Sequence, residues 1–369
     1  MIPMSGRFCR TRRITRKFSM FRVRALTISL CLLLAGIGLP KAYAKGIRAG
    51  CAGEALCQQQ FVRIGGIEQW ISIAGDSRAN PVLLMVHGGP GIPLWPDAAR
   101  FKPWEKYFTV VLWDQRGAGH TFGRYGTHTP DVTLQRIVKD GVDLSRYLCR
   151  TLGKKKIIVL GHSWGALVGV HMAQQAPQRI AVYVGTGQVS DFRAAALIQY
   201  HLILAQARRD DAVAELKALQ ALGRPDPDSA RQYAAYRKYL PTIIATQDLT
   251  FLRAQRRAAP SLLAAYPQEG RDFFAGERFS KARLWPYVMR TDLPKTVPAL
   301  HTAFIVIQGK RDVFAPTKLA ENYLHSVKAP YKKLVVIPHA GHFALLTSPK
   351  SFLRALLKYV RPVAIARGG

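Results

Sequence analysis

KIIVLGHSWGALVGVHMAQQ, residues 156–175, is the stretch of sequence that decides the fold. Its apolar start, residues 156–160, predicts a buried strand, and residues 166–174 predict a helix. Residues 161–165 between them have the spacing G-x-S-x-G, which is typical of a tight strand–turn–helix with the serine hydroxyl exposed at its tip. A side chain at either glycine would collide with neighbouring backbone. Ser163 is therefore the candidate nucleophile.

A nucleophilic serine needs a base to accept its proton and an acid to orient that base. With this turn, the chain order is serine, then aspartate or glutamate, then histidine. Asp312 follows the predicted strand 303–308, and His342 follows the predicted strand 333–338. Taken alone, Asp312 is a candidate helix N-cap and His342 a polar loop residue. Because they follow successive strands in the required order, we predict that both act with Ser163.

Two other histidines lie near these motifs but are poorer candidates for the base. His162 belongs to the turn itself and is expected to point away from the serine. His339 comes too early in its loop. His342 therefore remains the predicted base.

A glycine-rich loop, HGGPG at residues 87–91, follows the apolar run 82–86. Its small residues let backbone N–H groups approach a substrate carbonyl closely. We predict that the N–H groups of Gly89 and Trp164 form an oxyanion hole, which stabilises a tetrahedral intermediate by several kcal/mol, about 3 for one donor. The alternative is a phosphate-binding loop, but no Walker lysine and no GxGxxG pattern accompanies it.

The remaining pattern indicates one doubly wound, mostly parallel sheet that is interrupted by a helical insertion. Alternating runs at 60–64 and 68–74, separated by Gly65 and Gly66, predict an antiparallel hairpin at the sheet edge. Apolar runs with the length of buried parallel strands then begin at residues 82, 108, 156, 180, 303 and 333. Between them, residues 188–297 have helical periodicity, with breaks expected at Pro225, Pro227, Pro241, Pro260 and Pro286, and a last helix is predicted at 350–359. The predicted organisation is core 45–187, cap 188–297 and core 298–369.

The first 44 residues are typical of a cleavable export signal. Residues 7–24 carry eight basic residues and no acid, and an apolar run follows at 25–39. This run is shorter than the roughly 20 residues of a membrane-spanning helix. Ala42-Tyr43-Ala44 suits cleavage before Lys45. We predict an exported, periplasmic or secreted protein with no stable membrane span after cleavage.

The charge and the cysteines restrict the possible partners further. The net charge is +32, and it falls to +23 when the nine basic residues of the leader are removed. No nucleic-acid motif and no basic run interleaved with aromatic residues is present, so we expect no nucleic-acid partner. In an oxidising compartment Cys51 and Cys57 are able to pair, whereas Cys149 is expected to be a buried thiol. No cysteine has metal-site spacing.

HGGPG, the segment WDQRGAG at residues 113–119 and the serine turn with its tryptophan together resemble the proline iminopeptidase group of α/β hydrolases. The resemblance covers residues 60–187 and 302–352. It implies the α/β-hydrolase fold, an eight-stranded sheet with an inserted helical cap. It also implies a serine exopeptidase that removes an N-terminal residue, often proline, from a short peptide or small molecule, without cofactor or metal. By position, Ser163, Asp312 and His342 take the catalytic roles, Gly89 and Trp164 the oxyanion roles, and the 114–119 segment is largely structural.

The cap leaves the substrate class open. Aminopeptidases of this group bind the substrate amine with cap carboxylates, yet this cap is rich in arginine and its acids match no such position by sequence: Asp191, Asp210, Asp211, Glu215, Asp226, Asp228, Asp248, Glu269, Asp272, Glu277 and Asp292. A carboxylesterase or lactonase with the same triad is the main alternative. A cofactor-free haloperoxidase and a non-catalytic binding protein are less favoured. Cap aromatic residues are able to line an acyl pocket, but for most of them helix packing is the expected role.

Overall fold

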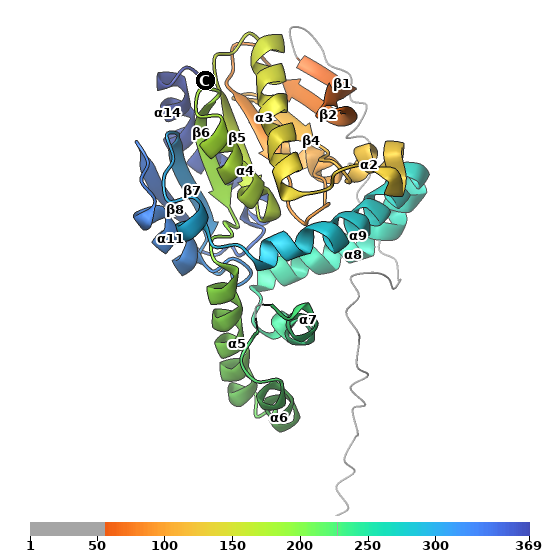
Figure 1. The fold of residues 1–369 in the computed structure, drawn as a ribbon, viewed down its shortest axis with the longest axis vertical. Coiled ribbons are helices and arrows are strands. Elements are labelled where there is room, and N and C mark those ends of the chain that lie inside the picture. The colour runs from red at the N-terminus through yellow and green to blue at the C-terminus, as the bar shows by residue number, and fades with distance from the viewer. Residues whose placement is uncertain (1–55, 227) are drawn as a thin grey trace, which may run out of the picture. The chain divides into compact units, whose positions relative to one another are not determined.

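The computed structural model describes residues 56–226 and 228–369, and within them eight strands form one sheet (Figure 1). The strand order is β1-β2-β4-β3-β5-β6-β7-β8. The strands are β1 (Leu56–Ile64), β2 (Ile67–Gly75), β3 (Val82–Val86), β4 (Thr109–Trp113), β5 (Ile157–His162), β6 (Ile180–Thr186), β7 (Ala303–Gly309) and β8 (Lys332–Ile337).

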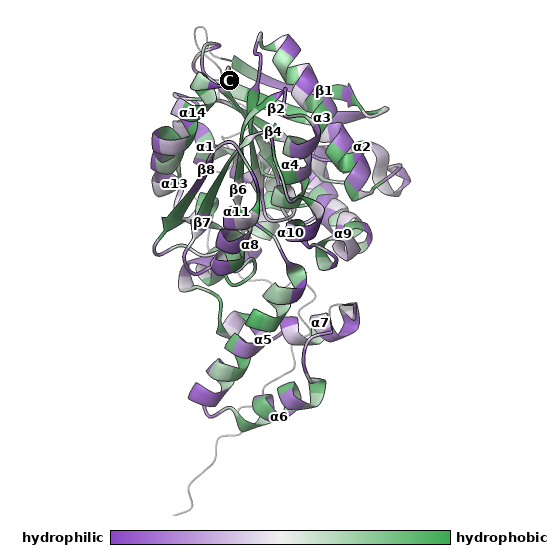
Figure 2. Ribbon diagram, turned by 60° about the vertical axis from the view of Figure 1, so that its left-hand side comes forward, coloured by the Kyte–Doolittle hydropathy of each residue, from purple (hydrophilic) through white to green (hydrophobic). Residues whose placement is uncertain are grey.

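Strand direction follows the sequence pattern. β1 pairs with β2 and β2 with β4 in antiparallel register, and every other neighbouring pair is parallel. The predicted edge hairpin and mostly parallel sheet are therefore confirmed. Strands β3 to β7 are buried along their whole length because helices cover both faces of the sheet. Figure 2 shows hydrophobic residues along these strands, while the helices around them carry both hydrophilic and hydrophobic residues.

Alternate residues of each central strand pack into two cores. In β5, Ile157 and Val159 face one core, and Ile158 and Leu160 face the other. The first core includes α3 (Leu134–Thr151), α4 (Trp164–Gln175) and α11 (Thr317–Ser326). The second includes α1 (Ala98–Phe101), α12 (Ala344–Thr347), α13 (Pro349–Ala355) and α14 (Arg361–Ala366). Short 3₁₀ helices occur at Trp95–Asp97, Lys102–Trp104, Gly126–His128 and Leu240–Thr242.

Among the described residues, six α-helices lie between β6 and β7, and we call them the cap. They are α5 (Phe192–Arg209), α6 (Val213–Leu222), α7 (Ala230–Arg237), α8 (Thr246–Ala265), α9 (Pro267–Met289) and α10 (Leu293–Thr296). The two ends of the cap are hydrogen-bonded together, Phe192 N–H to Thr291 O at 3.0 Å and Leu293 N–H to Ser190 O at 2.7 Å. Figure 1 shows α8 and α9 side by side near α2 (Gly119–Tyr125), while α5 to α7 extend away from the sheet.

Two expected helix breaks are wrong. Pro260 lies inside α8 and Pro286 inside α9. A proline removes one backbone donor and strains the preceding turn, but packing of the flanking turns keeps these long helices continuous. The last helix also differs from its prediction at 350–359, because α13 passes through a π-helical turn, Leu356–Val360, into α14.

The 113–119 segment has a structural anchor. The Arg116 guanidinium, 1 % exposed, forms an ion pair with Asp140 of α3 at 2.8 Å. It also donates to the main-chain oxygens of Pro130 and Gly65. Removing one partner of such a buried, fully hydrogen-bonded pair typically costs about 3–5 kcal/mol.

The cysteines and the leader are only partly covered by the described residues. Cys149 is a buried free thiol, as predicted. Cys57 is disulfide-bonded, and Cys51, its expected partner, lies outside the described residues, as does the predicted leader. Within residues 56–226 and 228–369, none of the helices combines the length and apolar character needed to cross a membrane.

Candidate active site

Ser163 occupies a strained turn between β5 and α4. Its φ is +55° and its ψ −117°, a left-handed conformation that a residue with a side chain rarely adopts. The Ser163 N–H donates to the main-chain oxygen of Thr186 at 3.0 Å, which fixes the turn to β6. Ser163 is partly exposed, while His162 and Trp164 on either side of it are buried.

Both glycines of the turn are required by close packing. A Cβ atom at Gly161 would overlap the carbonyl oxygen of Gly165. A Cβ atom at Gly165 would overlap the main-chain oxygen of Val86 in β3. The G-x-S-x-G spacing therefore allows the strand, the turn and the helix to pack at backbone contact.

Asp312 and His342 are brought together by the loops after β7 and β8. His342 Nδ1 lies 2.9 Å from Asp312 Oδ2 and 3.1 Å from Oδ1. Asp312 Oδ1 also accepts the N–H groups of Phe314 and Ala315, and Oδ2 accepts from Gln308 Nε2 at 2.9 Å. Asp312 thus accepts hydrogen bonds from the backbone of the turn that follows it and also pairs with His342.

Burial and two carboxylates set the proton affinity of His342. Burial lowers the pKa of His342, but the charges of Asp312 and Asp248 and the hydrogen bond to Asp312 outweigh it, so the pKa is raised. The Asp312 contact places the proton of the neutral imidazole on Nδ1, which leaves Nε2 as the acceptor. Within the described residues, Ser163 and His342 form no hydrogen bond. The hydrogen bond between a catalytic nucleophile and its base is often long or poorly aligned before substrate binds.

The 87–91 loop, which carries the predicted oxyanion residue Gly89, lies beside Ser163. A Cβ atom at Gly88 would lie 3.3 Å from the Ser163 Cβ, so the 87–91 loop is in contact with the nucleophile turn. In the described part of the chain, the backbone N–H groups of Gly89 and Trp164 have no hydrogen-bond partner. Two unused donors at a nucleophile are what an oxyanion requires.

Gln115, which sequence reasoning missed, connects Trp164 with the 87–91 loop. Its Oε1 accepts the indole N–H of Trp164 at 2.9 Å, and its Nε2 donates to the main-chain oxygen of His87 at 3.0 Å. Its backbone N–H donates to His87 Nε2 at 3.2 Å, and His87 Nδ1 lies 2.9 Å from Gly88 O. Burial lowers the pKa of His87, in agreement with this neutral, doubly bonded ring.

Two cap carboxylates are more buried than sequence reasoning could indicate. Asp248 in α8 is 1 % exposed, and it accepts the N–H groups of His342 and Phe343. Glu277 in α9 is 9 % exposed, and its Cα would lie 3.1 Å from a Cβ atom at Gly91. Within the described residues, the Glu277 carboxylate has no hydrogen-bond or ion-pair partner. Burial raises the pKa of Glu277, although Lys281, Arg278 and Arg237 oppose this shift.

The aromatic residues of the cap mostly pack against each other. Tyr200 and Tyr236 belong to a separate core of α5 to α7. Tyr233 stacks on Trp285 with ring centroids 5.9 Å apart. Phe251 contacts Phe343 beside the predicted base.

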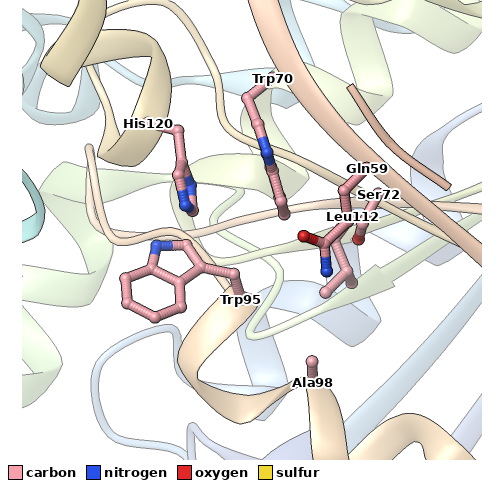
Figure 3. Close-up of a pocket in the computed structure, with 7 residues that line it drawn as sticks. All are labelled: Gln59, Trp70, Ser72, Trp95, Ala98, Leu112 and His120. Atoms are coloured by element: carbon pink, nitrogen blue, oxygen red, sulfur yellow. The ribbon is translucent and has the colours of Figure 1, made fainter. Parts of the chain in front are cut away.

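A small cavity is lined by residues that belong to none of the loops of Ser163, Asp312 and His342, and Figure 3 shows its lining. Its volume is about 30 Å³, which is room for a water molecule and not for a substrate. Trp70 stacks on His120 at 4.3 Å in its wall. The lining residues are Gln59, Trp70, Ser72, Trp95, Ala98, Leu112 and His120. In the described ranges, no group of three or more His, Cys, Asp or Glu side chains is placed to bind a metal ion.

Comparison with known proteins identifies the class. The sequence model of the α/β-hydrolase fold family matches residues 81–349, so the chain belongs to this family and is a hydrolase. It is 28 % identical over 305 residues to the probable aminopeptidase YbaC of Bacillus subtilis, covering 81 % of this chain and 94 % of the relative. It is 25 % identical over 303 residues to a probable proline iminopeptidase of Streptomyces coelicolor, covering 78 % and 90 %. The crystal structure of a Mycobacterium smegmatis proline iminopeptidase superposes with a TM-score of 0.56 at 18 % identity, covering 84 % and 99 %. The resemblance predicted from the motifs is confirmed.

Proposed function

We propose that this chain is an exported serine aminopeptidase of the proline iminopeptidase type, which acts through an acyl-enzyme. The observations that carry the chemical part are the Asp312–His342 pair at 2.9 Å and the serine held at φ +55°, whose neighbour His162 contacts the main chain of His342. In this mechanism His342 Nε2 takes the Ser163 proton as Oγ attacks the scissile carbonyl carbon. The Gly89 and Trp164 N–H groups stabilise the oxyanion.

The protonated His342 then donates its proton to the leaving amine, and the carbonyl re-forms as an ester to Ser163. Water next attacks this ester, His342 again takes the proton, and Ser163 leaves with that proton. Asp312 keeps its charge throughout and stabilises the imidazolium. Its hydrogen bonds to Phe314, Ala315 and Gln308 hold the carboxylate in place.

Glu277 supports the proposed substrate class. A free N-terminal amine is a hydrated cation, and bringing it under a cap is costly unless a carboxylate meets it. Both oxygens of Asp248 already accept main-chain N–H groups. Glu277 is nearly buried, lies on the helix that packs against Gly91, and has no internal partner in the described chain. We assign it as the amine-binding carboxylate.

Hydrolysis of prolyl-arylamide and of its N-acetylated form tests this proposal. We expect the wild-type protein to prefer the free amine strongly. Glu277→Gln should lose about 10²-fold in kcat/KM on the free amine, because the substrate ammonium would then be bound without its carboxylate, with little change on the acetylated substrate. Glu269→Gln, in the same helix α9, is the matched control and should behave as wild type.

The alternative function has its own signature in this assay. Indifference of the wild type to acetylation, or turnover of acyl esters only, would contradict the aminopeptidase and favour the carboxylesterase or lactonase with the same triad. Equal loss in the Glu269 and Glu277 variants would remove Glu277 from the amine site.

A further inference from the structure

The loop of the predicted base is held by a carboxylate that comes from the cap. Asp248 lies in the first turn of α8, 94 residues before His342 in the sequence. Its Oδ2 accepts the His342 N–H, and its Oδ1 accepts the Phe343 N–H at 3.3 Å. Two consecutive backbone donors therefore converge on one buried carboxylate, an arrangement stronger than neutral hydrogen bonds.

The carbonyl group of His342 is held by a residue of the nucleophile turn. His162 Nε2 lies 3.1 Å from the His342 carbonyl oxygen. A carbonyl only accepts, so His162 Nε2 carries the proton. The main chain of the base is thus fixed on its N–H side by the cap and on its C=O side by the residue next to Ser163.

The surroundings leave little freedom for this contact. A Cβ atom at Gly341 would overlap Asp248 Oδ2 and lie 3.1 Å from the Ala245 Cβ, so glycine makes room for the carboxylate. Phe251, one helical turn after Asp248, packs on Phe343 with ring centroids 5.2 Å apart. The start of α8 therefore contacts the base loop through a charged and an apolar contact together.

We propose that Asp248 is a positioning residue, through which docking of the cap fixes the main chain of His342 and strengthens it as a base. This inference rests on the proposed role of His342 in catalysis. It goes beyond that role because it concerns a cap residue that need not touch substrate. Asp248 would set the main-chain position of His342 and the proton affinity of its ring.

The charges around His342 define the electrostatic effect. Asp312, in the loop after β7, contacts the ring of His342. Neutral His162, at the end of β5, contacts its carbonyl oxygen, and Asp248, in α8, contacts its backbone N–H. Burial raises the pKa of Asp248, and the charge of Asp312 adds to this rise. His342 and the two backbone donors oppose the rise, but the net pKa of Asp248 remains raised. Because the Asp248 charge raises the pKa of His342, its removal should lower that pKa.

Asp248→Asn tests the proposal, since it keeps the side-chain shape but removes the charge and one acceptor. Asp248→Glu keeps the charge. Asp210→Asn, which changes an exposed aspartate at the end of α5, is the matched control. For each variant we would measure the rate of fluorophosphonate labelling against pH, amide hydrogen exchange across residues 340–345, and Tm.

We expect Asp248→Asn to label about tenfold more slowly at the plateau and to exchange residues 340–345 faster. The midpoint of its acid limb should fall by roughly half a pH unit, a modest effect for one nearby charge. Asp248→Glu should keep the wild-type midpoint. Behaviour like that of Asp210→Asn, or a lower Tm with unchanged rate and midpoint, would overturn the proposal. Failure of the proposed function is separate: without the triad chemistry the wild-type protein itself is not labelled at Ser163, and a different substrate class appears only in the acetylation assay.

Discussion

The Nε2–H of His162 donates a hydrogen bond of 3.1 Å to the main-chain oxygen of His342. The two rings lie 5.0 Å apart, but His162 does not titrate as a second base. Burial, together with the nearby His342, lowers the pKa of His162 to about 3. His162 therefore stays neutral in the working range of the enzyme and joins the nucleophile turn to the base loop.

This neutral histidine predicts a loss of stability in acid. Its folded pKa lies below its unfolded value of about 6.5, so the unfolded chain binds more protons between these values and stability falls as pH decreases. Below about pH 6.5, Tm should fall less steeply with acid in His162→Gln, which keeps an N–H donor, than in the wild type. Parallel Tm curves for the two proteins between about pH 4 and 7 would contradict the assignment.

The raised pKa of His342 predicts the acid limb of the reaction. The base works only when neutral, so kcat/KM should fall as pH drops through its pKa, with a midpoint above the ordinary value of about 6.5. A pH profile of kcat/KM on an arylamide measures this midpoint. A limb centred clearly below 6.5 would mean that burial outweighs the two carboxylates, contrary to this account.

Gln115 is expected to act on the transition state through the oxyanion donors. In Gln115→Ala, the indole of Trp164 and the carbonyl of His87 both lose their partner, so kcat should fall about 10²-fold with little change in KM. Gln69→Ala is the matched control, because buried Gln69 accepts the indole N–H of Trp113 in the same way at 2.9 Å. A similar kcat loss in both variants would indicate general destabilisation instead.

The parallel core and its catalytic candidates were predictable because they depend on local patterns. Apolar runs fixed the strands, and parallel strands end at one edge of the sheet, so Ser163, Asp312 and His342 follow from strand ends alone. The pairing of Asp312 with His342 at 2.9 Å agrees with that prediction.

The cap contacts were not predictable in the same way. Helical periodicity does not tell which loop a helix will pack against, so Asp248 and Glu277 were two acids among eleven in the cap. The role of Gln115 depends on the side-chain direction after β4. The breaks expected at Pro260 and Pro286 were wrong because tertiary packing outweighs the local cost of proline.

Export predicts a defined N-terminus for the mature protein. Cleavage after Ala44 should leave Lys45, or a residue one or two positions away, at the N-terminus of protein recovered from the cell envelope or the medium. N-terminal sequencing or intact mass measures this directly. Mature protein that still begins at Met1 or Met20 would indicate a retained leader.

The central claim is that Ser163 is the nucleophile, and covalent labelling tests it most directly. The wild-type protein should react with a fluorophosphonate probe, and peptide mass spectrometry should place the adduct on Ser163. Ser163→Ala should keep the wild-type circular dichroism spectrum, since alanine removes only the hydroxyl, and lose all labelling and hydrolysis. Undiminished labelling of a folded Ser163→Ala protein, or an adduct on another residue, would contradict the account.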